Sequence, residues 1–405
     1  MENTPKSLRL HLAIAGRINV GKSTLFNLIS GQDAAITSPE RGTTTDVVEK
    51  TLELRPLGAA VLLDTAGSDD DGVLGKQRLE RTENALKRAD AIILTVSPGV
   101  WDAPENAAVA TARELNVPLI AVINIHSAPP AETFVTMVRE RTGHDPLSVC
   151  AIDRTQRSDF LNRFTEALQK VLPDELITPP LLRDLLPAGG TILLMTPIDT
   201  QAPKGRLILP QVQAIRDALD GDCTVTVAKE SAFPDVYRKF TALPDLVVCD
   251  SQVVKMMINT APAGVKMTTF SILMARMKGD LETFARGCAA LERLAAGSRV
   301  LIAESCTHHA GSDDIGRVKI PRMLMAKTGR KLEFEFCAGH DFPDDLSPFK
   351  IVVHCGSCML NRRETLNRLE KARAAGKPVV NYGILISYCQ GVSDRVIAPL
   401  LGNGK

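Results

Sequence analysis

The amino-acid sequence predicts an α/β protein built from three domains, and three observations support this prediction. At 405 residues the chain is too long for one ordinary domain. Short apolar runs alternate with amphipathic helical segments, a pattern typical of parallel sheets covered by helices on both faces. A stretch rich in proline and glycine, residues 177–190, interrupts this alternation and marks a domain boundary. The expected domains are therefore residues 1–175, 180–272 and 273–405.

The expected strands and helices follow from these patterns. In the first domain, strands are expected at residues 9–15, 59–65, 91–97 and 118–124, and helices from Lys22 onward, at 76–89, at 104–116 and near 157–173. In the second domain, strands are expected at 191–198, 223–229 and 245–251, and a helix at 210–220. In the third, helices are expected at 279–296 and 360–375, and strands at 299–305, 349–355 and 377–383.

The overall composition excludes several classes of function. The net charge is +1 and aromatic residues make up 4% of the chain, which argues against a nucleic-acid partner or an anionic membrane. No stretch approaches the roughly 20 apolar residues of a membrane span, and the amino terminus lacks a secretory pattern. We therefore expect a cytoplasmic protein, in which the nine cysteines are reduced. An odd number of reduced thiols favours metal ligation or burial over disulfides.

Residues 16–24, Gly-Arg-Ile-Asn-Val-Gly-Lys-Ser-Thr, match the phosphate-binding pattern G-x-x-x-x-G-K-[ST] between a strand and a helix. In such a loop, backbone N–H groups and the helix amino terminus bind phosphate oxygens. Lys22 is expected to reach the β- and γ-phosphates, and Ser23 to coordinate Mg²⁺. The expected nucleotide-binding residues in this loop are Gly16, Asn19, Val20, Gly21, Lys22, Ser23 and Thr24.

Two later segments complete the pattern of a nucleotide switch. Asp64-Thr-Ala-Gly67 follows a buried strand, where the aspartate organises Mg²⁺ and the glycine N–H senses the γ-phosphate. The threonine-rich segment 41–46 lies between the two motifs and suits a switch loop. Lys22 and Asp64 are therefore the expected catalytic residues of a GTPase-type domain that uses GTP and Mg²⁺.

A second constellation consists of cysteines and histidines. Cys306-Thr-His308 follows one expected strand, and His354-Cys355-Gly-Ser-Cys358 follows another. Loops after neighbouring parallel strands meet at one edge of the sheet, so the three cysteines are expected to form one metal site. Three thiolates suit a [4Fe–4S] cluster with one iron left to another ligand, whereas a Cys₃His zinc site is the alternative.

The remaining ligand of the cysteine site stays open at this point. His308 and His354 abut the cysteines and are candidates for it. Glu304 is a further candidate, although a solvated carboxylate is the simpler expectation. The other six cysteines are expected to be inert, and these are Cys150, Cys223, Cys249, Cys288, Cys337 and Cys389.

The loop Asn19-Val-Gly-Lys-Ser, with Gly-Thr-Thr-Thr-Asp at 42–46 and Asp64-Thr-Ala-Gly, resembles the TrmE–Era group of GTPases. This resemblance implies that Asn19 binds K⁺ beside the phosphates and that Thr44 binds Mg²⁺. The guanine-reading motif of the group, Asn-Lys-x-Asp, is replaced here by Asn124-Ile-His-Ser127. Asn124 and the pair Cys150-Ala151 then remain as the expected base-binding residues, and guanine selectivity is left open.

Nearly the whole chain is similar to the HydF family, the GTPase maturases of [FeFe]-hydrogenase. The resemblance rests on the cysteine motifs and on residues 197–213, 339–343, 358–363 and 381–383. It implies a scaffold that holds a [4Fe–4S] cluster through Cys306, Cys355 and Cys358 and carries a precursor of the di-iron subcluster. The implied partners are two radical-SAM maturases, apo-[FeFe]-hydrogenase and a second copy of the chain, bound through the middle domain.

Two rival interpretations remain from the residues alone. The first is a general P-loop GTPase of RNA or ribosome processing with a structural zinc site. The second is an interaction protein with a vestigial P-loop, against which the intact Lys22, Ser23 and Asp64 argue.

Overall fold

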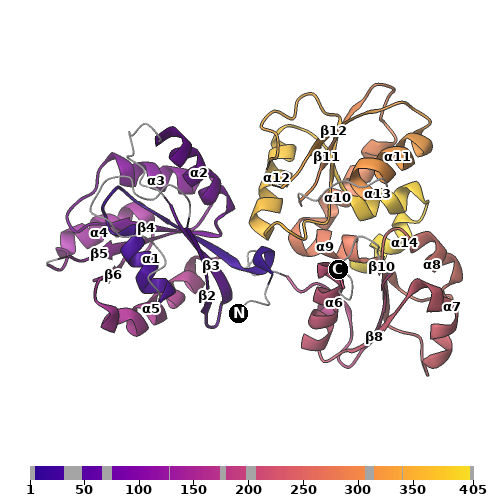
Figure 1. The fold of residues 1–405 in the computed structure, drawn as a ribbon, viewed down its shortest axis with the longest axis horizontal. Helices are drawn as coiled ribbons and strands as arrows, with labels where there is room; N and C mark the ends of the chain where they lie inside the picture. The colour runs from indigo at the N-terminus through magenta and orange to yellow at the C-terminus, as the bar shows by residue number, and fades with distance from the viewer. Residues whose placement is uncertain are drawn as a thin grey trace. The chain divides into compact units, whose positions relative to one another are not determined.

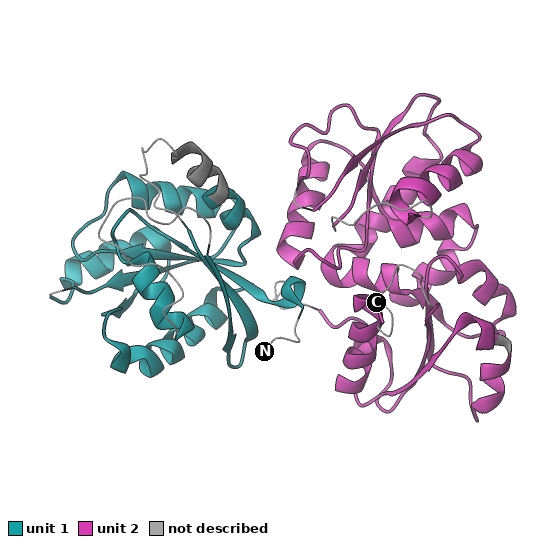
Figure 2. Ribbon diagram, in the orientation of Figure 1, with its two compact units in different colours: residues 1–177 teal, residues 178–405 magenta. Residues whose placement is uncertain are grey.

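The computed structural model describes residues 5–31, 48–65, 75–126, 128–173, 179–197, 207–305, 314–339 and 341–401. The chain folds into two compact units, residues 1–177 and 178–405, which Figure 2 shows in different colours. The first unit contains one sheet and the second contains two, each with helices around it (Figure 1). The predicted fold class is thereby confirmed: the protein is α/β, and its sheets are parallel except for one edge strand.

Unit 1 is built on a six-stranded sheet in the order β2-β3-β1-β4-β5-β6. Its strands are β1 (Leu10–Ala15), β2 (Val48–Leu54), β3 (Gly58–Asp64), β4 (Ala91–Val96), β5 (Leu119–Asn124) and β6 (Leu147–Val149). Its helices are α1 (Lys22–Ser30), α2 (Gly75–Arg88), α3 (Ala103–Glu114), α4 (Glu132–Thr142) and α5 (Arg157–Val171). The predicted strands β1, β3, β4 and β5 form its centre. The antiparallel edge strand β2 was not predicted, because its sequence VEKTLEL is polar and largely unburied.

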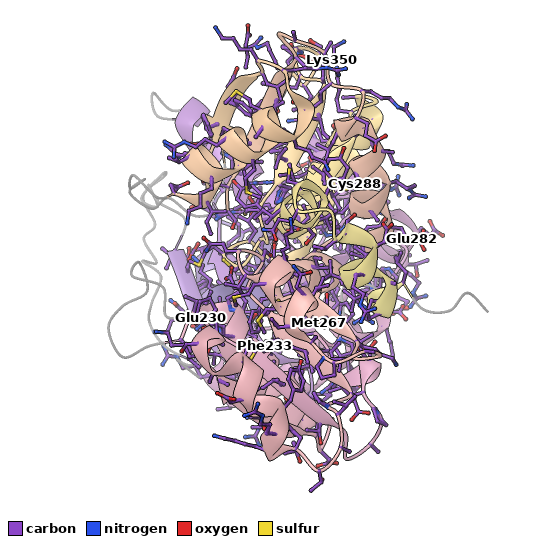
Figure 3. All side chains as sticks on the ribbon, turned by 90° about the vertical axis from the view of Figure 1, so that its right-hand side faces the viewer. Glu230, Phe233, Met267, Glu282, Cys288 and Lys350 are labelled. Carbon is purple, nitrogen blue, oxygen red and sulfur yellow. The ribbon has the colours of Figure 1, made fainter. Side chains whose placement is uncertain are left out.

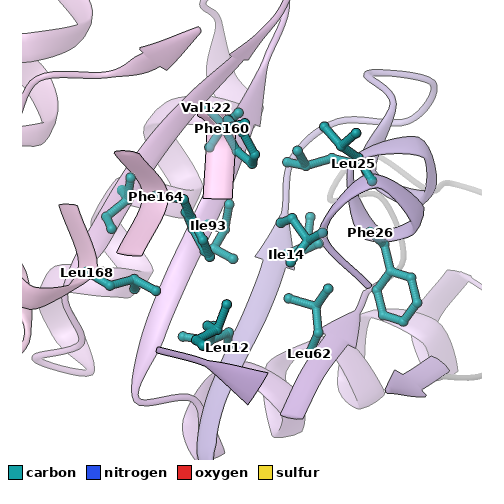
Figure 4. Packing of buried hydrophobic residues seen from close by; sticks show 14 of the residues in the cluster. Leu12, Ile14, Leu25, Phe26, Leu62, Ile93, Val122, Phe160, Phe164 and Leu168 are labelled. Atoms are coloured by element: carbon teal, nitrogen blue, oxygen red, sulfur yellow. The ribbon is translucent and has the colours of Figure 1, made fainter. Parts of the chain in front are cut away.

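Alternate residues of the central strands form a separate core on each face of this sheet. On one face, Leu12 and Ile14 of β1 pack with residues of α1 and α5. On the other face, Ala13 and Ala15 pack with residues of α2 and α3. Figure 4 shows the first core, in which Phe160, Phe164 and Leu168 of α5 point toward the strands. Their spacing of four residues places all three on one side of the helix.

Unit 2 contains two four-stranded parallel sheets, in the orders β10-β9-β7-β8 and β12-β11-β13-β14. The first has strands β7 (Thr191–Met195), β8 (Thr224–Ala228), β9 (Leu246–Cys249) and β10 (Met267–Thr269). The second has strands β11 (Arg299–Ala303), β12 (Glu333–Cys337), β13 (Ile351–His354) and β14 (Val379–Asn381). The helices are α6 (Leu209–Asp220), α7 (Phe233–Val236), α8 (Val254–Thr260), α9 (Phe270–Lys278), α10 (Leu281–Leu291), α11 (Ile320–Thr328), α12 (Arg362–Ala374), α13 (Tyr382–Cys389) and α14 (Ser393–Ile397).

The strands next to the cysteine motifs are shorter than the sequence predicts. β11 ends at Ala303 and β13 at His354, so Glu304, Ser305 and Cys355 lie in the loops beyond them. These loops are adjacent, because β11 and β13 pair directly and Ala303 lies opposite His354. Within the described ranges, no helix combines the length and the apolar character that crossing a membrane requires.

Replacing Phe164 with alanine is expected to lower the free energy of unfolding of unit 1 by about 3–5 kcal/mol, because it leaves a cavity in the core against α5. The single tryptophan, Trp101, lies in unit 1, so its fluorescence during urea unfolding measures this transition. The exposed Ile152 provides the control, and Ile152→Ala is expected to change the free energy by less than about 0.5 kcal/mol. Equal effects of the two substitutions would contradict this description of the core.

Candidate functional site

The loop between β1 and α1 has the backbone of a phosphate-binding loop. Gly16 and Gly21 have φ angles of +143° and +91°, and Asn19 has +60°. A Cβ atom at Gly21 would lie 2.2 Å from Asn124 Nδ2, and one at Gly16 would lie 2.6 Å from the Thr95 carbonyl oxygen. Only glycine fits at these two positions, since both the φ angle and the available space exclude a side chain. Asparagine is among the few other residues that tolerate the conformation seen at position 19.

Lys22 and Ser23 lie in the first turn of α1, together with the half-buried Thr24. Nζ of Lys22 donates hydrogen bonds to the carbonyl oxygens of Gly16 (3.1 Å) and Arg17 (2.8 Å). Lys22 therefore curls over the loop, and its ammonium lies where the loop would enclose a phosphate. Ser23 Oγ donates a 2.7 Å hydrogen bond to Oδ2 of Asp64, at the carboxyl end of β3.

Asp64 is a buried carboxylate with an unused oxygen. It is 1% exposed, and no hydrogen-bond partner of its Oδ1 occurs among the described residues. Burial raises the pKa of Asp64, although the hydrogen bond from Ser23 and the charge of Lys22 act in the opposite direction. A carboxylate beside a serine hydroxyl at a phosphate loop is the usual donor set for Mg²⁺. The residues present therefore fit a magnesium ion at this point.

Asn124, at the end of β5, connects the phosphate loop with the segment after β6. Its Nδ2 donates to the carbonyl oxygen of Val20 (3.0 Å), and its Oδ1 accepts from the N–H of Ala151 (3.1 Å). The N–H of Cys150 is bonded to Oε1 of Gln156 at 3.3 Å. Both polar ends of the Asn124 side chain are thus used to hold loops together. This asparagine shapes the nucleotide site, and these bonds do not prevent a contact with the base, because its amide group carries a second N–H donor.

An ion pair between Arg17 and the buried Glu105 holds the phosphate loop, and it was not predicted from the sequence. Arg17 donates through Nε to Oε1 of Glu105 (2.8 Å) and through a terminal nitrogen to Oε2 (2.6 Å) and to Asp102 (3.1 Å). Glu105 is fully buried near the start of α3, where it also accepts from the N–H of Asp102. Burial raises the pKa of Glu105, but its hydrogen bonds outweigh this effect and the net pKa is lowered. The capping pattern Asp102-x-x-Glu105 was the available sequence signal.

Several expected residues lie outside the described part of the chain. In unit 1 these are Thr44 and the threonine-rich segment 41–46, Gly67 and Ser127. In unit 2 they are Cys306 and His308. Their roles remain predictions from the sequence.

In unit 2, the loop after β13 lies against the loop after β11. Sγ of Cys355 accepts a 3.0 Å hydrogen bond from the N–H of Ser305 and donates through its thiol to Ser305 Oγ, also at 3.0 Å. The N–H of Cys355 donates to the carbonyl oxygen of Ala303 at 3.0 Å. Ser305 immediately precedes Cys306 in the sequence. The backbone therefore brings Cys355 to the residue that precedes Cys306.

Cys358 belongs to the same group of thiols. Burial raises its pKa to about 11, and the nearby Cys355 contributes to the increase, whereas a hydrogen bond with Ser305 and the charge of Lys278 lower it. Cys355 and Cys358 both interact with Ser305, which places the two thiols near each other. Without Cys306 and His308, the described residues contain no group of three cysteine, histidine or acidic side chains in metal-binding geometry. The two described thiols fit two ligands of a soft metal centre.

His354 and Glu304 are both buried beside these thiols. His354 is 1% exposed, and burial together with the charge of Arg368 lowers its pKa to about 4, so the ring is neutral. Its Nδ1 bonds to the carbonyl oxygen of Cys355 (2.9 Å), and its Nε2 has no hydrogen-bond partner among the described residues. The expectation that Glu304 is solvated was wrong: it is 3% exposed and accepts a 3.0 Å bond from Nε of Arg317. Glu304 directly follows the last residue of β11 and is held there by its bond with Arg317.

Three family models match successive parts of the chain. Residues 11–125 match the family described as 50S ribosome-binding GTPase. Residues 181–279 match the hydrogen maturase F dimerization domain, and residues 282–399 match the hydrogen maturase F tetramerization domain.

Individual curated relatives are similar to part of the chain. The tRNA modification GTPase MnmE of Zymomonas mobilis is 34% identical over 181 residues, covering 43% of this chain and 37% of the relative. MnmE of a Synechococcus species is 42% identical over 124 residues, covering 30% and 26%. The GTPase Der of Rhodopseudomonas palustris is 33% identical over 166 residues, covering 40% and 35%. The chain thus spans only about a third of the length of these relatives.

The order of the matches agrees with the order of the sites. The phosphate loop lies in the range of the GTPase match, and the cysteine loops lie in the range of the tetramerization match. The first part of the chain is a GTPase domain, and the remainder corresponds to two domains that define one family. The chain belongs to the hydrogen maturase F family.

Proposed function

We propose that this protein is a nucleotide-controlled scaffold for [FeFe]-hydrogenase maturation, which holds a [4Fe–4S] cluster through Cys306, Cys355 and Cys358. The observation that carries the proposal is the pair of hydrogen bonds between Cys355 and Ser305, the residue before Cys306. It supports a single centre formed by two motifs that are about fifty residues apart in the sequence. The family membership supports hydrogenase maturation as the process served.

Soft sulfur donors favour iron–sulfur clusters or zinc over hard cations. When bound through three thiolates, a [4Fe–4S] cluster offers one iron whose fourth ligand can exchange. That open position suits a carrier, because a cargo cluster can attach there and leave. His308, His354 and Glu304 remain the candidates for the resting fourth ligand. His354 is neutral, and its Nε2 has no hydrogen-bond partner among the described residues. Glu304 could bind iron only after its hydrogen bond with Arg317 is broken.

The GTPase domain supplies the control step in this proposal. Gly16, Gly21 and Lys22 bind the phosphates of GTP, while Ser23, Asp64 and Thr44 hold Mg²⁺. Asn19 binds K⁺, and the N–H of Gly67 contacts the γ-phosphate. Hydrolysis then changes the affinity for the radical-SAM maturases or for apo-hydrogenase, because switch loops rearrange when the γ-phosphate leaves.

Recognition of the base is weaker than in related GTPases. Asn124 is retained, but Ile125 and His126 stand where the motif has lysine and a variable residue, and Ser127 stands where it has aspartate. His126 is exposed, and its Nδ1 bonds to the carbonyl oxygen of Asn124 at 3.0 Å. The described residues of this motif therefore lack a carboxylate that could accept the guanine N–H groups. We expect GTP to be preferred over ATP by a smaller factor than in GTPases that retain the aspartate.

The dimerization and tetramerization matches support self-association. In the first sheet of unit 2, β8 is an edge strand and carries the exposed Val227. Val212 and Leu219 of α6 are exposed apolar residues of the same domain. Exposed apolar residues around an open edge strand are typical of a surface that pairs with another chain.

One alternative function rests on the GTPase match to residues 11–125 and on the MnmE and Der similarities, which cover 43% and 40% of the chain. In that alternative, the protein is a general GTPase of RNA or ribosome processing, and the cysteines hold zinc. Analysis of the bound metal separates the two functions.

Replacing Lys22 with alanine is expected to weaken GTP binding at least tenfold and to abolish hydrolysis, because the loop loses its one phosphate-directed ammonium. Isothermal titration calorimetry with GTP and with ATP measures binding, and phosphate release measures hydrolysis. Lys6→Ala is the matched control: this lysine pairs with Glu49 at the surface of unit 1 and is expected to have no effect. Unchanged GTP binding by Lys22→Ala would contradict the nucleotide site, and exclusion of ATP by the wild type would contradict weak base recognition.

Replacing Cys306, Cys355 and Cys358 together with alanine is expected to abolish cluster binding. After anaerobic reconstitution, the wild type should contain about four irons and four sulfides per chain and show an EPR signal on reduction. The triple variant should show neither, whereas a control variant with Cys150, Cys288 and Cys389 replaced by alanine should match the wild type. Zinc in place of iron, or iron retained by the first variant, would contradict the cluster assignment.

A further inference from the structure

The hydrogen-bond ladder between β11 and β13 ends on a cysteine sulfur. The N–H of Cys355 donates to the carbonyl oxygen of Ala303 at 3.0 Å, in the regular pattern of a parallel pair. The next donor of the ladder is the N–H of Ser305, and its regular acceptor would be the carbonyl oxygen of Cys355. This N–H donates instead to Sγ of Cys355, at 3.0 Å. Figure 3 labels Lys350, which directly precedes β13, so the sulfur lies at the opposite end of that strand.

The carbonyl oxygen of Cys355 is occupied by two side chains. Nδ1 of His354 bonds to it at 2.9 Å, and the amide of Asn381 donates to it at 3.4 Å. Asn381 is fully buried, and its Oδ1 accepts a 3.1 Å hydrogen bond from Oγ of Ser271, which fixes the orientation of the amide. The acceptor that a regular ladder would offer to Ser305 is therefore engaged elsewhere, and the backbone donor of Ser305 points at sulfur.

The hydroxyl of Ser305 meets the same sulfur. Its Oγ lies 3.0 Å from Sγ of Cys355 and accepts the thiol proton, and a side-chain hydrogen bond also joins Ser305 to Cys358. Ser305 is 4% exposed. Hydrogen bonds in such a buried place are electrostatically stronger than hydrogen bonds in water. The backbone and the side chain of one residue thus converge on one sulfur atom.

These contacts acquire a different role when the sulfur binds iron. A cysteine binds iron as a thiolate, so the sulfur of Cys355 then has no proton to donate and only accepts. The hydroxyl of Ser305 rotates freely about its C–O bond, and its hydrogen then turns toward the sulfur. The N–H and the O–H of Ser305 both donate to a negatively charged acceptor. Because reduction adds negative charge, such bonds stabilise the reduced form of a cluster more than the oxidised form.

We infer that Ser305 is a positioning residue of the proposed cluster site: its N–H and its hydroxyl hold the sulfur of Cys355 and raise the reduction potential of the bound cluster. This inference rests on the proposed function, because it requires a cluster at Cys306, Cys355 and Cys358. It deepens that function by assigning control of the potential to a residue that is not itself a ligand. A serine before a cysteine forms no motif, so the sequence alone did not single it out.

The test is an EPR-monitored redox titration of the reconstituted full chain. Ser305→Ala removes the hydroxyl and keeps the N–H, and it is expected to shift the midpoint potential to a more negative value at unchanged iron content. Ser305→Thr keeps a hydroxyl and is expected to stay close to the wild-type potential. Ser298→Ala is the matched control, because this buried serine directly precedes β11 at the opposite end of the strand and accepts from the N–H of Ala295.

A second readout detects the hydrogen bond itself. Electron–nuclear double resonance of the reduced cluster in D₂O records exchangeable deuterons close to the cluster. The wild type and Ser305→Thr are expected to show the coupling of a hydroxyl deuteron, and Ser305→Ala is expected to lack it. A purely structural role of Ser305 would leave this coupling unchanged.

Each outcome decides the inference. A wild-type potential in Ser305→Ala, or an equal shift in Ser298→Ala or in Ser305→Thr, would overturn it. Loss of iron from both Ser305 variants would also overturn it, because the serine would then be needed to assemble the site rather than to set its potential. Absence of iron from the wild type would refute the proposed cluster and this inference with it. Iron analysis of the wild type distinguishes that case from the others.

Discussion

Parallel pairing of neighbouring strands is the constraint on which both sites depend, because it brings the loops after those strands to one edge of a sheet. In unit 1, Ile14 of β1 lies opposite Asp64 of β3, and this register brings the phosphate loop to the carboxylate that Ser23 contacts. In unit 2, Ala303 of β11 lies opposite His354 of β13, and this register brings Ser305 to Cys355. A shift of either register would separate the groups that each ligand requires.

Both sites also contain buried charged side chains, which a stable fold accommodates only where an opposite charge or hydrogen bonds stabilise them. In unit 1, Arg17 and Glu105 neutralise each other's charge, and their bonds hold Arg17 in place in the phosphate loop. Oδ1 of Asp64, in contrast, has no hydrogen-bond partner among the described residues. In unit 2, Lys278 is 1% exposed, and its charge acts on the thiol of Cys358. The oxygen of Asp64 that has no partner among the described residues is complementary to the proposed Mg²⁺.

Local patterns in the sequence predicted the buried strands β1, β3, β4 and β5, because their runs are apolar throughout. β2 and β12 lie at sheet edges, and their sequences VEKTLEL and EFEFC mix charged with apolar residues and are largely unburied, so no such run marks them. The phosphate loop and the C-x-x-C motif were recognisable because their chemistry depends on short spacings. The Arg17–Glu105 pair, the burial of Glu304 and the position of Lys278 depend on contacts between distant segments, which spacing along one chain does not reveal.

We propose that the loop after β11 and the loop after β13 together hold one iron–sulfur cluster. Anomalous diffraction at the iron and zinc absorption edges, from crystals of the anaerobically reconstituted protein, tests this proposal. We expect an iron peak next to the sulfur atoms of Cys355 and Cys358, on the side of Ser305, with Cys306 as the third sulfur ligand. A peak at the zinc edge only, or iron bound away from these cysteines, would contradict it.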